Sequence, residues 1–276
     1  MKAVVLAAGE GVRMRPITLT RPKHMIPVAG KPFVEYLLRA LKGAGVSEIL
    51  MVVGYGRDLI ESYFGDGSGW GLDLAYVPQE AVRGTAHAIG LAEEYVGKEA
   101  FVAVYGDLLI SSDVVESALK AHRRRGLVTM TVVPVEEEER YGVVSVKDGY
   151  VVDVVEKPQR GAAPSNLANA GVFVFTEDVF KGIRRTQRSV REELEITETL
   201  RLLVEGGERV VPVRVSPEEW MDIGRPWDLL EANRRILEDL KPEVWGDVEE
   251  GARIIGPVGV ARGVRIRSGA YIVGPV

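Results

Sequence analysis

The 276-residue sequence has no cysteine, which excludes disulfide bonds, zinc–thiolate sites and cysteine nucleophiles. It has no apolar run of membrane-spanning length, and glycines and charges follow its short apolar start too soon for a signal peptide. Basic residues are not in excess, since 35 Lys and Arg stand against 40 Asp and Glu, a net charge of −5. This balance excludes a general binder of nucleic acid or of anionic membranes. Asn and Gln number only three each, which is typical of thermophilic proteins. We therefore expect a cytoplasmic protein that meets any phosphate ligand with locally placed Lys and Arg.

The order of apolar and amphipathic segments predicts the fold. Strands are expected at residues 3–6, 49–53, 72–77, 101–105 and 127–133, and helices at residues 33–42, 85–95 and 112–124. A hairpin at 143–146 and 151–155 turns at Asp148-Gly149, and a strand at 172–175, a helix at 192–204, a strand at 210–215 and a helix at 227–240 follow. Buried strands separated by helices predict an α/β fold: a Rossmann-like, mainly parallel sheet with helices on both faces.

The pattern changes after Pro242, where apolar residues recur every six positions. The period-six residues are Val248, Ile254, Val260, Ile266 and Ile272. A pair of hairpins would alternate with period two, so this spacing favours a parallel β-helix built from hexapeptides. We expect residues 1–241 to form one domain and residues 242–276 to form a truncated piece of such a β-helix.

A glycine-rich loop follows the first predicted strand. The loop contains Leu6, Ala8, Gly9, Gly11 and Arg13, and Lys23 follows it. Glycines let backbone N–H groups approach phosphate oxygens closely, and Arg or Lys then neutralises the charge. A dinucleotide-binding dehydrogenase would carry a third glycine where Met14 stands and would begin a helix at once. Pro16 and Pro22 instead predict a long irregular loop that can wrap a triphosphate.

Two acids stand directly after predicted apolar strands. Asp107 follows the strand at 101–105, and Asp222 follows Trp220-Met221. A carboxylate just beyond the carboxyl end of a parallel strand lies where open α/β sheets bind ligands. Two separated carboxylates suit Mg²⁺, whose other ligands are then water and nucleotide phosphate. Each acid taken alone fits a helix cap as well as a metal ligand.

Further polar motifs lie near the predicted hairpin. Glu156 and Lys157 end it, and Gly142 precedes it. Lys157 can hold a phosphate as a point charge and Glu156 can accept hydrogen bonds from hydroxyls, although spacing alone favours a solvated turn. Asn169-Ala170-Gly171 fits either a turn or an amide beside a glycine that allows close approach.

Taken together, these motifs resemble the nucleotidyltransferase family that makes nucleoside-diphosphate sugars. The matching segments, in family order over residues 1 to about 240, are residues 6–13 with Lys23, Gly106-Asp107, Glu156-Lys157-Pro158, Asn169-Ala170-Gly171 and residues 220–224. The resemblance implies an enzyme in which a sugar-1-phosphate oxygen attacks the α-phosphorus of a nucleoside triphosphate and pyrophosphate leaves. The hexapeptide tail resembles the C-terminal domain of bifunctional members, which is a left-handed β-helix and acetylates an amino-sugar phosphate.

The resemblance also implies roles for individual residues. Asp107 and Asp222 would hold Mg²⁺. Arg13 and Lys23 would hold the triphosphate, and Lys157 the sugar phosphate. The implied nucleotide contacts are Leu6, Ala8, Gly9, Gly11, Gln79, Gly84 and Thr85, and the implied sugar contacts are Gly142, Glu156 and Asn169.

The chemistry of Gln79, which resembles the family's base-reading residue, indicates which nucleotide base the protein binds. A glutamine amide offers a donor and an acceptor, matching O4 and N3–H of uracil or thymine, whereas guanine favours a carboxylate. We therefore expect UTP or dTTP, between which the amide does not distinguish. The hexose phosphate stays open between glucose-1-phosphate and N-acetylglucosamine-1-phosphate.

Two alternatives belong to other functional classes. A non-catalytic nucleotide-sugar-binding regulatory subunit of the same fold would tend to lose charged ligands, yet all the expected ones are present here. An acyltransferase with its site between β-helix chains would need a longer tail and a base, and no histidine follows His122. The sequence therefore favours the transferase, which we expect to be a homo-oligomer.

Overall fold

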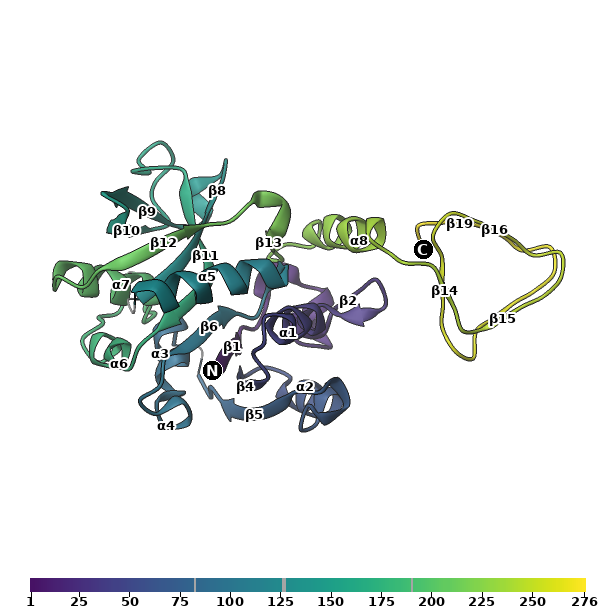
Figure 1. Ribbon diagram of the computed structural model, residues 1–276, viewed down its shortest axis with the longest axis horizontal. Helices are drawn as coiled ribbons and strands as arrows, with labels where there is room; N and C mark the ends of the chain where they lie inside the picture. The colour runs from purple at the N-terminus through teal and green to yellow at the C-terminus, as the bar shows by residue number, and fades with distance from the viewer. Residues whose placement is uncertain (82, 126–127, 190) are drawn as a thin grey trace. The chain divides into compact units, whose positions relative to one another are not determined.

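The computed structural model describes residues 1–81, 83–125, 128–189 and 191–276 (Figure 1). Within them the chain forms two compact units. The first consists of Met1–Ile26 and Pro32–Gly224, and the second of Pro27–Lys31 and Arg225–Val276. The boundary thus falls at Gly224, earlier than the predicted boundary at residue 241. The 27–31 segment groups with the last helix, whose Asn233 side chain accepts a hydrogen bond from the Ala29 amide at 2.7 Å.

A nine-stranded sheet in the order β5-β4-β1-β6-β11-β8-β12-β10-β9 forms the centre of the first unit. Its strands are β1 (Ala3–Ala7), β4 (Glu48–Val53), β5 (Asp73–Pro78), β6 (Phe101–Tyr105), β8 (Val128–Pro134), β9 (Gly142–Lys147), β10 (Tyr150–Glu156), β11 (Leu167–Phe175) and β12 (Val210–Arg214). Short strands β2 (Pro27–Val28), β3 (Lys31–Pro32), β7 (Leu108–Ile110) and β13 (Trp220–Asp222) lie outside this sheet. The first residue of the strand predicted at 127–133 lies outside the described residues.

The direction of the strands positions one edge of the sheet for binding. β1 pairs in parallel with β4 and β6, and β4 pairs in parallel with β5, so these four strands end at the same edge. β11 runs antiparallel to β6 and β8, and β10 runs antiparallel to β12 and β9. Apart from β10 and β11, the other seven of the nine strands run in the same direction (9 − 2). The sheet is therefore mixed: β10 belongs to the predicted hairpin, and β11 is a reversed strand that the prediction of a mainly parallel sheet did not include.

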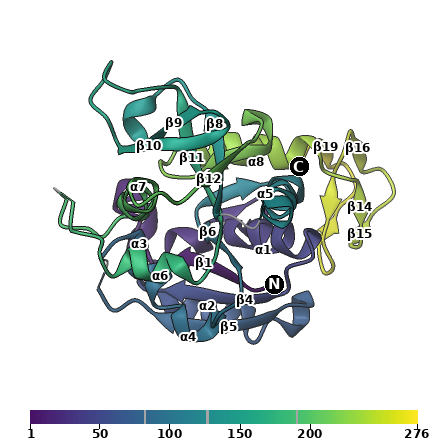
Figure 2. The same ribbon diagram turned by 60° about the vertical axis from the view of Figure 1, so that its left-hand side comes forward.

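Helices cover both faces of this sheet. The helices of this unit are α1 (Phe33–Gly43), α2 (Arg57–Phe64), α3 (Thr85–Gly90), α4 (Glu93–Val96), α5 (Ser112–Arg125), α6 (Asp178–Ile183) and α7 (Ile196–Glu205). Side chains alternate along β1, so that Val5 packs in a core with α1 and α5 while Val4 packs in a second core with α3, α6 and α7. Figure 2 shows these two groups of helices on opposite sides of β1 and β6.

Two predicted helices differ from the observed ones. The helix expected at 85–95 is divided into α3 and α4. The helix expected at 192–204 begins at Ile196, because Leu194 is held extended by two backbone hydrogen bonds. The Leu194 amide donates to the Arg83 carbonyl at 2.7 Å, and the Leu194 carbonyl accepts from the Ala86 amide at 2.9 Å. This cross-link joins two segments that are more than a hundred residues apart in sequence, which a local pattern could not indicate.

The predicted hairpin is confirmed. β9 and β10 pair antiparallel with Tyr150 opposite Lys147, which leaves Asp148-Gly149 as the two-residue turn. Both turn residues have positive φ, 52° and 79°, as a tight hairpin of this twist requires.

The second unit contains α8 (Asp228–Glu238) and three parallel two-stranded ladders. The ladders join β14 (Glu243–Val244) to β17 (Gly259–Val260), β15 (Asp247–Val248) to β18 (Arg265–Ile266), and β16 (Arg253–Ile255) to β19 (Tyr271–Val273). Figure 1 shows this segment as a triangular double trace.

The period-six residues of this unit do not all point inward. Val260 and Ile266 are buried together with Val258, and Ile254 and Ile272 pack against them. Val248, in contrast, is 40% exposed. The six-residue period therefore describes the interior of the segment better than its first coil.

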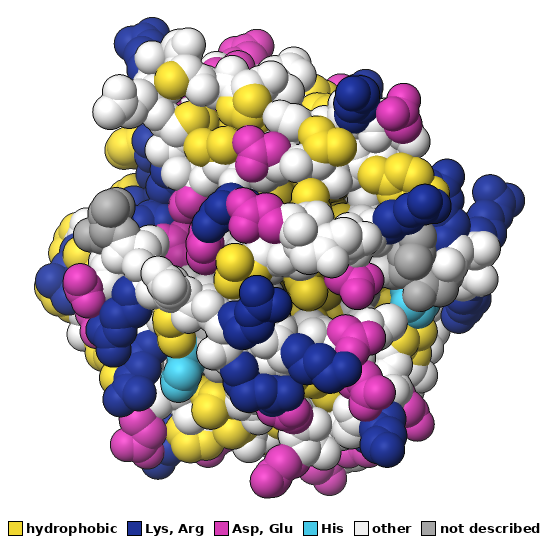
Figure 3. All heavy atoms as spheres, turned by 90° about the vertical axis from the view of Figure 1, so that its left-hand side faces the viewer, with side chains coloured by type: hydrophobic (Ala, Val, Ile, Leu, Met, Phe, Trp, Pro, Cys, Tyr) yellow, Lys and Arg dark blue, Asp and Glu magenta, His cyan; other side chains and the backbone are white. Residues whose placement is uncertain are grey.

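No helix in the described parts of the chain is long and apolar enough to cross a membrane. Figure 3 shows basic and acidic side chains interspersed on one face, in keeping with the nearly balanced composition.

Candidate active site

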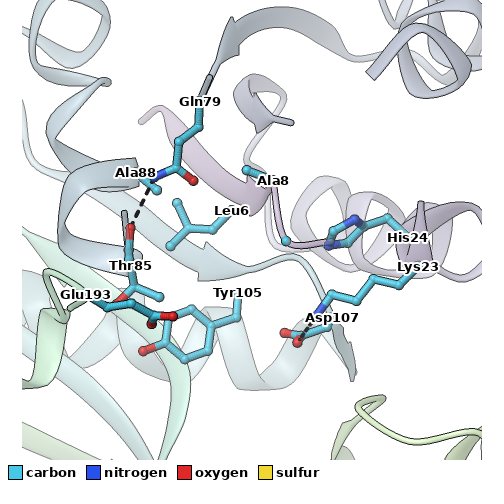
Figure 4. Close-up of a pocket in the computed structure, with 12 residues that line it drawn as sticks. Leu6, Ala8, Lys23, His24, Gln79, Thr85, Ala88, Tyr105, Asp107 and Glu193 are labelled. Carbon is cyan, nitrogen blue, oxygen red and sulfur yellow. Dashed lines mark hydrogen bonds and ion pairs between the residues drawn. The ribbon is translucent and has the colours of Figure 1, made fainter. Parts of the chain in front are cut away.

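A cavity of about 180 Å³ lies at the edge of the sheet where β1, β5 and β6 end (Figure 4). Its walls are formed by Leu6, Ala8, Gly9, Lys23, His24, Gln79, Gly84, Thr85, Ala88, Tyr105, Asp107 and Glu193. The predicted site residues among them are Leu6, Ala8, Gly9, Lys23, Gln79, Gly84, Thr85 and Asp107. The structure therefore brings the predicted nucleotide loop, base loop and first acid to one cavity.

Glycines bring the backbone of the nucleotide loop close to its neighbours. Gly11 has φ +65°, and a Cβ there would lie 3.0 Å from side-chain atoms of both Lys23 and Thr18. Gly106 donates its amide to the Leu6 carbonyl at 2.9 Å, and a Cβ on Gly106 would lie 2.6 Å from that oxygen. The loop can therefore turn tightly around Lys23, and the end of β6 can lie directly against β1.

The two predicted metal ligands are brought together by the small β7–β13 ladder. β7 begins directly after Asp107, and in the antiparallel pairing Asp222 stands opposite Leu108. The Ile223 amide donates to the Asp107 carbonyl at 2.8 Å, which continues this pairing. The register of this two-stranded ladder thus places side by side the backbones of two acids that are 115 residues apart in sequence (222 − 107).

Both acids interact with protein groups. Asp107 pairs with Lys23, and both side chains are largely buried. Burial raises the pKa of Asp107, but the charge and hydrogen bond of Lys23 outweigh it and hold that pKa below its ordinary value. Asp222 accepts a hydrogen bond from the Tyr141 hydroxyl at 2.7 Å and lies 3.8 Å from the Arg140 guanidinium. Carboxylates are the protein ligands that suit Mg²⁺, which takes its other ligands from water and phosphate, so both acids have the chemistry expected of the predicted metal ligands.

Arg13 lies beside the second acid and does not line the cavity. A Cβ built on Gly224 would be 3.2 Å from an Arg13 guanidinium nitrogen and 3.2 Å from the Asp222 carboxylate. The predicted triphosphate ligand and the predicted metal ligand therefore meet around Gly224, where the absence of a side chain leaves room for both.

Gln79 is held in the base loop by three hydrogen bonds. Its backbone amide donates to the Val53 carbonyl at 2.7 Å, and its side chain is only 5% exposed. The side-chain Nε2 donates to the Gly84 carbonyl at 3.2 Å and lies 2.9 Å from the Nδ1 of His87. In this structure the donor of the amide is therefore engaged within the protein, which leaves its oxygen as the group that can face a base.

The predicted sugar residues Gly142 and Glu156 contact each other outside this cavity. Glu156 accepts from the Thr197 hydroxyl at 2.9 Å and from the Arg191 guanidinium at 2.9 Å. A Cβ on Gly142 would lie 2.8 Å from the same carboxylate. Lys157 has φ +44°, is partly exposed, and lies 3.7 Å from Glu156.

Asn169 does not lie in a turn, which corrects one of the two expectations for this motif. It is a buried residue within β11, and its side-chain amide donates to the Tyr105 hydroxyl at 3.2 Å. Gly171 has φ +77°, and a Cβ there would come 2.5 Å from the Tyr105 ring. The glycine therefore allows close approach of Tyr105, and the ring of Tyr105 links Asn169 to the cavity wall.

Several site residues were not predicted from the sequence. His24 lines the cavity fully buried, and neither ring nitrogen has a partner among the described residues. Burial first, and then the charge of Lys23, lowers the pKa of His24 to about 3, so the ring is neutral. Its position directly after Lys23 in a loop expected to bind phosphate was the one signal that could have identified it.

Arg191 and Glu195 were also missed, because they belong to a run of charges that is typical of an exposed surface. The Arg191 guanidinium lies 2.7 Å from Glu195 and 2.9 Å from Glu156, bridging two carboxylates. Burial and then the charge of Glu195 raise the pKa of Glu156, whereas Lys157 and Arg191 oppose the rise. A sugar contact at Glu156 would therefore depend on the loop that carries Arg191.

Comparison with known proteins agrees with this arrangement. The family model described as "Nucleotidyl transferase" matches residues 2–239. The low-salt glycan biosynthesis nucleotidyltransferase of Haloferax volcanii is 39% identical over 266 residues, which cover 95% of this chain and 73% of that protein. A glucose-1-phosphate thymidylyltransferase of Streptomyces antibioticus is 37% identical over 278 residues, covering 100% of this chain and 77% of that protein.

A solved structure shares the fold. The crystal structure of UDP-glucose pyrophosphorylase complexed with UDP-glucose has a TM-score of 0.78 and 28% sequence identity, covering 86% of this chain and 98% of that one. On the extent of these matches and the order of its motifs, the chain belongs to the nucleotidyl transferase family.

Proposed function

We propose that this protein transfers a nucleoside monophosphate from UTP or dTTP to a hexose-1-phosphate, either glucose-1-phosphate or N-acetylglucosamine-1-phosphate, and releases pyrophosphate. The observation that carries the proposal is one cavity lined by the glycine loop, Gln79, Lys23 and Asp107, with the backbone that follows Asp222 paired to that of Asp107. The relatives named as glucose-1-phosphate thymidylyltransferase and UDP-glucose pyrophosphorylase support the substrate class.

The reaction needs alignment of two anions more than a covalent nucleophile. Lys23 and Arg13 neutralise the triphosphate and the leaving pyrophosphate, and Lys157 neutralises the incoming sugar phosphate. Mg²⁺ held by Asp107 and Asp222 supplies further charge neutralisation when bound. Because Lys23 pairs with Asp107 in the free protein, nucleotide binding must give Lys23 a new partner before that acid can serve a cation.

On the sugar side, Glu156 offers carboxylate oxygens to hydroxyl groups. Gly142 lies against that carboxylate with no side chain to block it, and Asn169 is linked to the cavity through Tyr105. These three residues have the polar chemistry that a hexose requires.

On the tail, we propose that residues 242–276 form the start of a left-handed parallel β-helix. Two ladders support this, because Asp247 pairs with Arg265 and Arg253 with Tyr271, each offset by 18 residues (265 − 247 and 271 − 253). An offset of three hexapeptides is what one coil of such a helix needs. Stacking of such coils in neighbouring copies would make the protein a homo-oligomer.

A pyrophosphate-release assay over a grid of nucleoside triphosphates and sugar-1-phosphates tests the proposed reaction. We expect release with UTP or dTTP together with a hexose-1-phosphate, and loss of release when Mg²⁺ is chelated. Binding of a nucleotide sugar without release from any pair would instead support a regulatory subunit.

A further inference from the structure

The side-chain nitrogen of Gln79 lies between two hydrogen-bond partners on the protein. The Gly84 carbonyl oxygen is 3.2 Å away, and the Nδ1 of His87 is 2.9 Å away. Gly84 directly precedes α3, and His87 lies in its first turn, half-buried, with Arg83 as the charged group that acts on it. Both hydrogens of the Gln79 NH₂ group are therefore directed toward protein atoms.

The hydrogen-bonding capacity of the Gly84 carbonyl determines the orientation of the Gln79 side-chain amide. A backbone carbonyl can only accept a hydrogen bond, so the nitrogen of Gln79 and not its oxygen must face Gly84. The Nδ1 of His87 must then accept from the same nitrogen, and the ring carries its proton on Nε2. Figure 4 shows the amide oxygen of Gln79 on the side of Leu6 and Ala8, and its nitrogen on the side of Thr85 and Ala88.

The Gln79 side chain therefore presents only a hydrogen-bond acceptor, its amide oxygen, to a nucleotide base. Uracil and thymine carry an N–H at N3 that can donate to this oxygen, whereas cytosine has a lone pair at N3 that would be repelled by it. To accept cytosine, the Gln79 amide would have to flip. A flip would direct its oxygen at the Gly84 carbonyl oxygen, which has no proton to donate, and His87 would have to move its proton from Nε2 to Nδ1 to meet the amide oxygen.

We propose that His87 is a positioning residue that determines base specificity by holding the Gln79 amide with its oxygen toward the base. The proposal rests on the proposed nucleotidyl transfer and adds to it the residue that rejects cytosine. His87 acts through Gln79, since it does not itself line the cavity. Of the two acceptors it makes the shorter contact, so its loss leaves the amide held by the longer Gly84 contact alone.

The test compares kcat/KM for UTP with that for CTP, and for dTTP with that for dCTP, in three variants. His87→Ala removes the acceptor, His87→Asn keeps a carbonyl acceptor near the position of Nδ1, and Glu94→Ala removes an exposed side chain of the neighbouring α4 as a control. We expect His87→Ala to lower the uracil-to-cytosine ratio by roughly tenfold, the effect of losing one orienting hydrogen bond. The change should come mainly from a lower KM for CTP, with kcat for UTP little altered.

His87→Asn should restore most of the ratio, and Glu94→Ala should leave it unchanged. A merely structural role for His87 would reduce the use of both bases equally and would not be rescued by Asn. An unchanged ratio in a folded His87→Ala, or equal ratios in the Ala and Asn variants, would overturn the inference while UTP turnover by the parent protein stood. If the parent protein turned over neither UTP nor dTTP, the proposed function would fail and this inference with it.

Discussion

At the scale of single residues, both predicted metal ligands have charged or polar partners within the protein. Asp107 pairs with Lys23, and Asp222 accepts from Tyr141, so both acids have protein partners before a cation arrives. Partial burial of Asp107 and Lys23 strengthens their interaction relative to that of an exposed pair.

We predict that Asp107→Asn and Asp222→Asn each reduce kcat by roughly a thousandfold, because each removes a charge that holds the metal at the reacting phosphate. Steady-state pyrophosphate release at ordinary Mg²⁺ concentration measures this, with circular dichroism to confirm folding. Asp113→Asn on α5 is the matched control and should retain full activity. Near-normal turnover of either site variant would remove that acid from the metal site.

Acid sensitivity should arise from His24. Its pKa is about 3 in the fully buried folded state and 6.5 when unfolded, so between these values only the unfolded chain binds the proton. Stability is thus present above pH 6.5 and is lost as the pH falls toward 3. From pH 8 to pH 5 the loss should be about 2 kcal/mol at 1.36 kcal/mol per pH unit.

The measurement is the free energy of unfolding by urea at pH 8 and pH 5, without metal, for the parent protein and His24→Leu. The leucine variant lacks the titrating ring and should lose about 2 kcal/mol less between these values. Equal losses in both proteins would show that other groups cause the acid sensitivity.

At the scale of elements, the base loop and α7 are tied together at Leu194. The Leu194 backbone bonds to Arg83 and Ala86, and the Thr85 hydroxyl accepts from the Ile196 amide at 2.9 Å. Gly84 stands at the centre of this junction, with φ +99° and its Cα hydrogen facing the Leu194 backbone. The base loop is therefore positioned by tertiary contact more than by its own sequence.

We predict that Gly84→Ala raises KM for the nucleotide by at least about tenfold, since the new methyl group would clash with the Leu194 carbonyl and displace the loop. Gly97→Ala is the matched control, because Gly97 also has positive φ, +64°, but a Cβ there meets nothing within 4 Å. Both variants share the backbone strain and only the first has the clash. Equal nucleotide KM values in the two variants would contradict the role given to the junction.

At the scale of the whole molecule, the residues that line the cavity all belong to the first compact unit. The tail ladders belong to the second unit, and among the described residues their strands pair with one another. We therefore expect nucleotidyl transfer not to require the tail.

We predict that a protein lacking residues 243–276 keeps kcat for nucleotidyl transfer within about twofold, because no cavity residue is removed. Its mass in solution, measured by light scattering, should fall to that of the monomer if the tail joins the copies. Loss of nucleotidyl transfer in a deletion that still folds would show that the tail contributes to the active site.

The sequence alone determined which residues could carry chemistry and most of the elements that hold them. Periodicity predicted β1, β6, α1 and α5 because burial of one face is a local property that neighbouring residues record. The Asp148-Gly149 turn was predicted for the same reason, since positive φ is a demand on those two residues alone.

Only the tertiary structure decided which of these residues meet. The backbones at Asp107 and Asp222 lie together because of the register of the β7–β13 ladder, which depends on pairing between distant segments. The orientation of the Gln79 amide depends on the Gly84 carbonyl and His87. The position at which α7 begins depends on the hydrogen bonds from Leu194 to the base loop. A local pattern records the environment of a residue but not the identity of its distant partners, and hydrogen bonding and charge at this site depend on those partners.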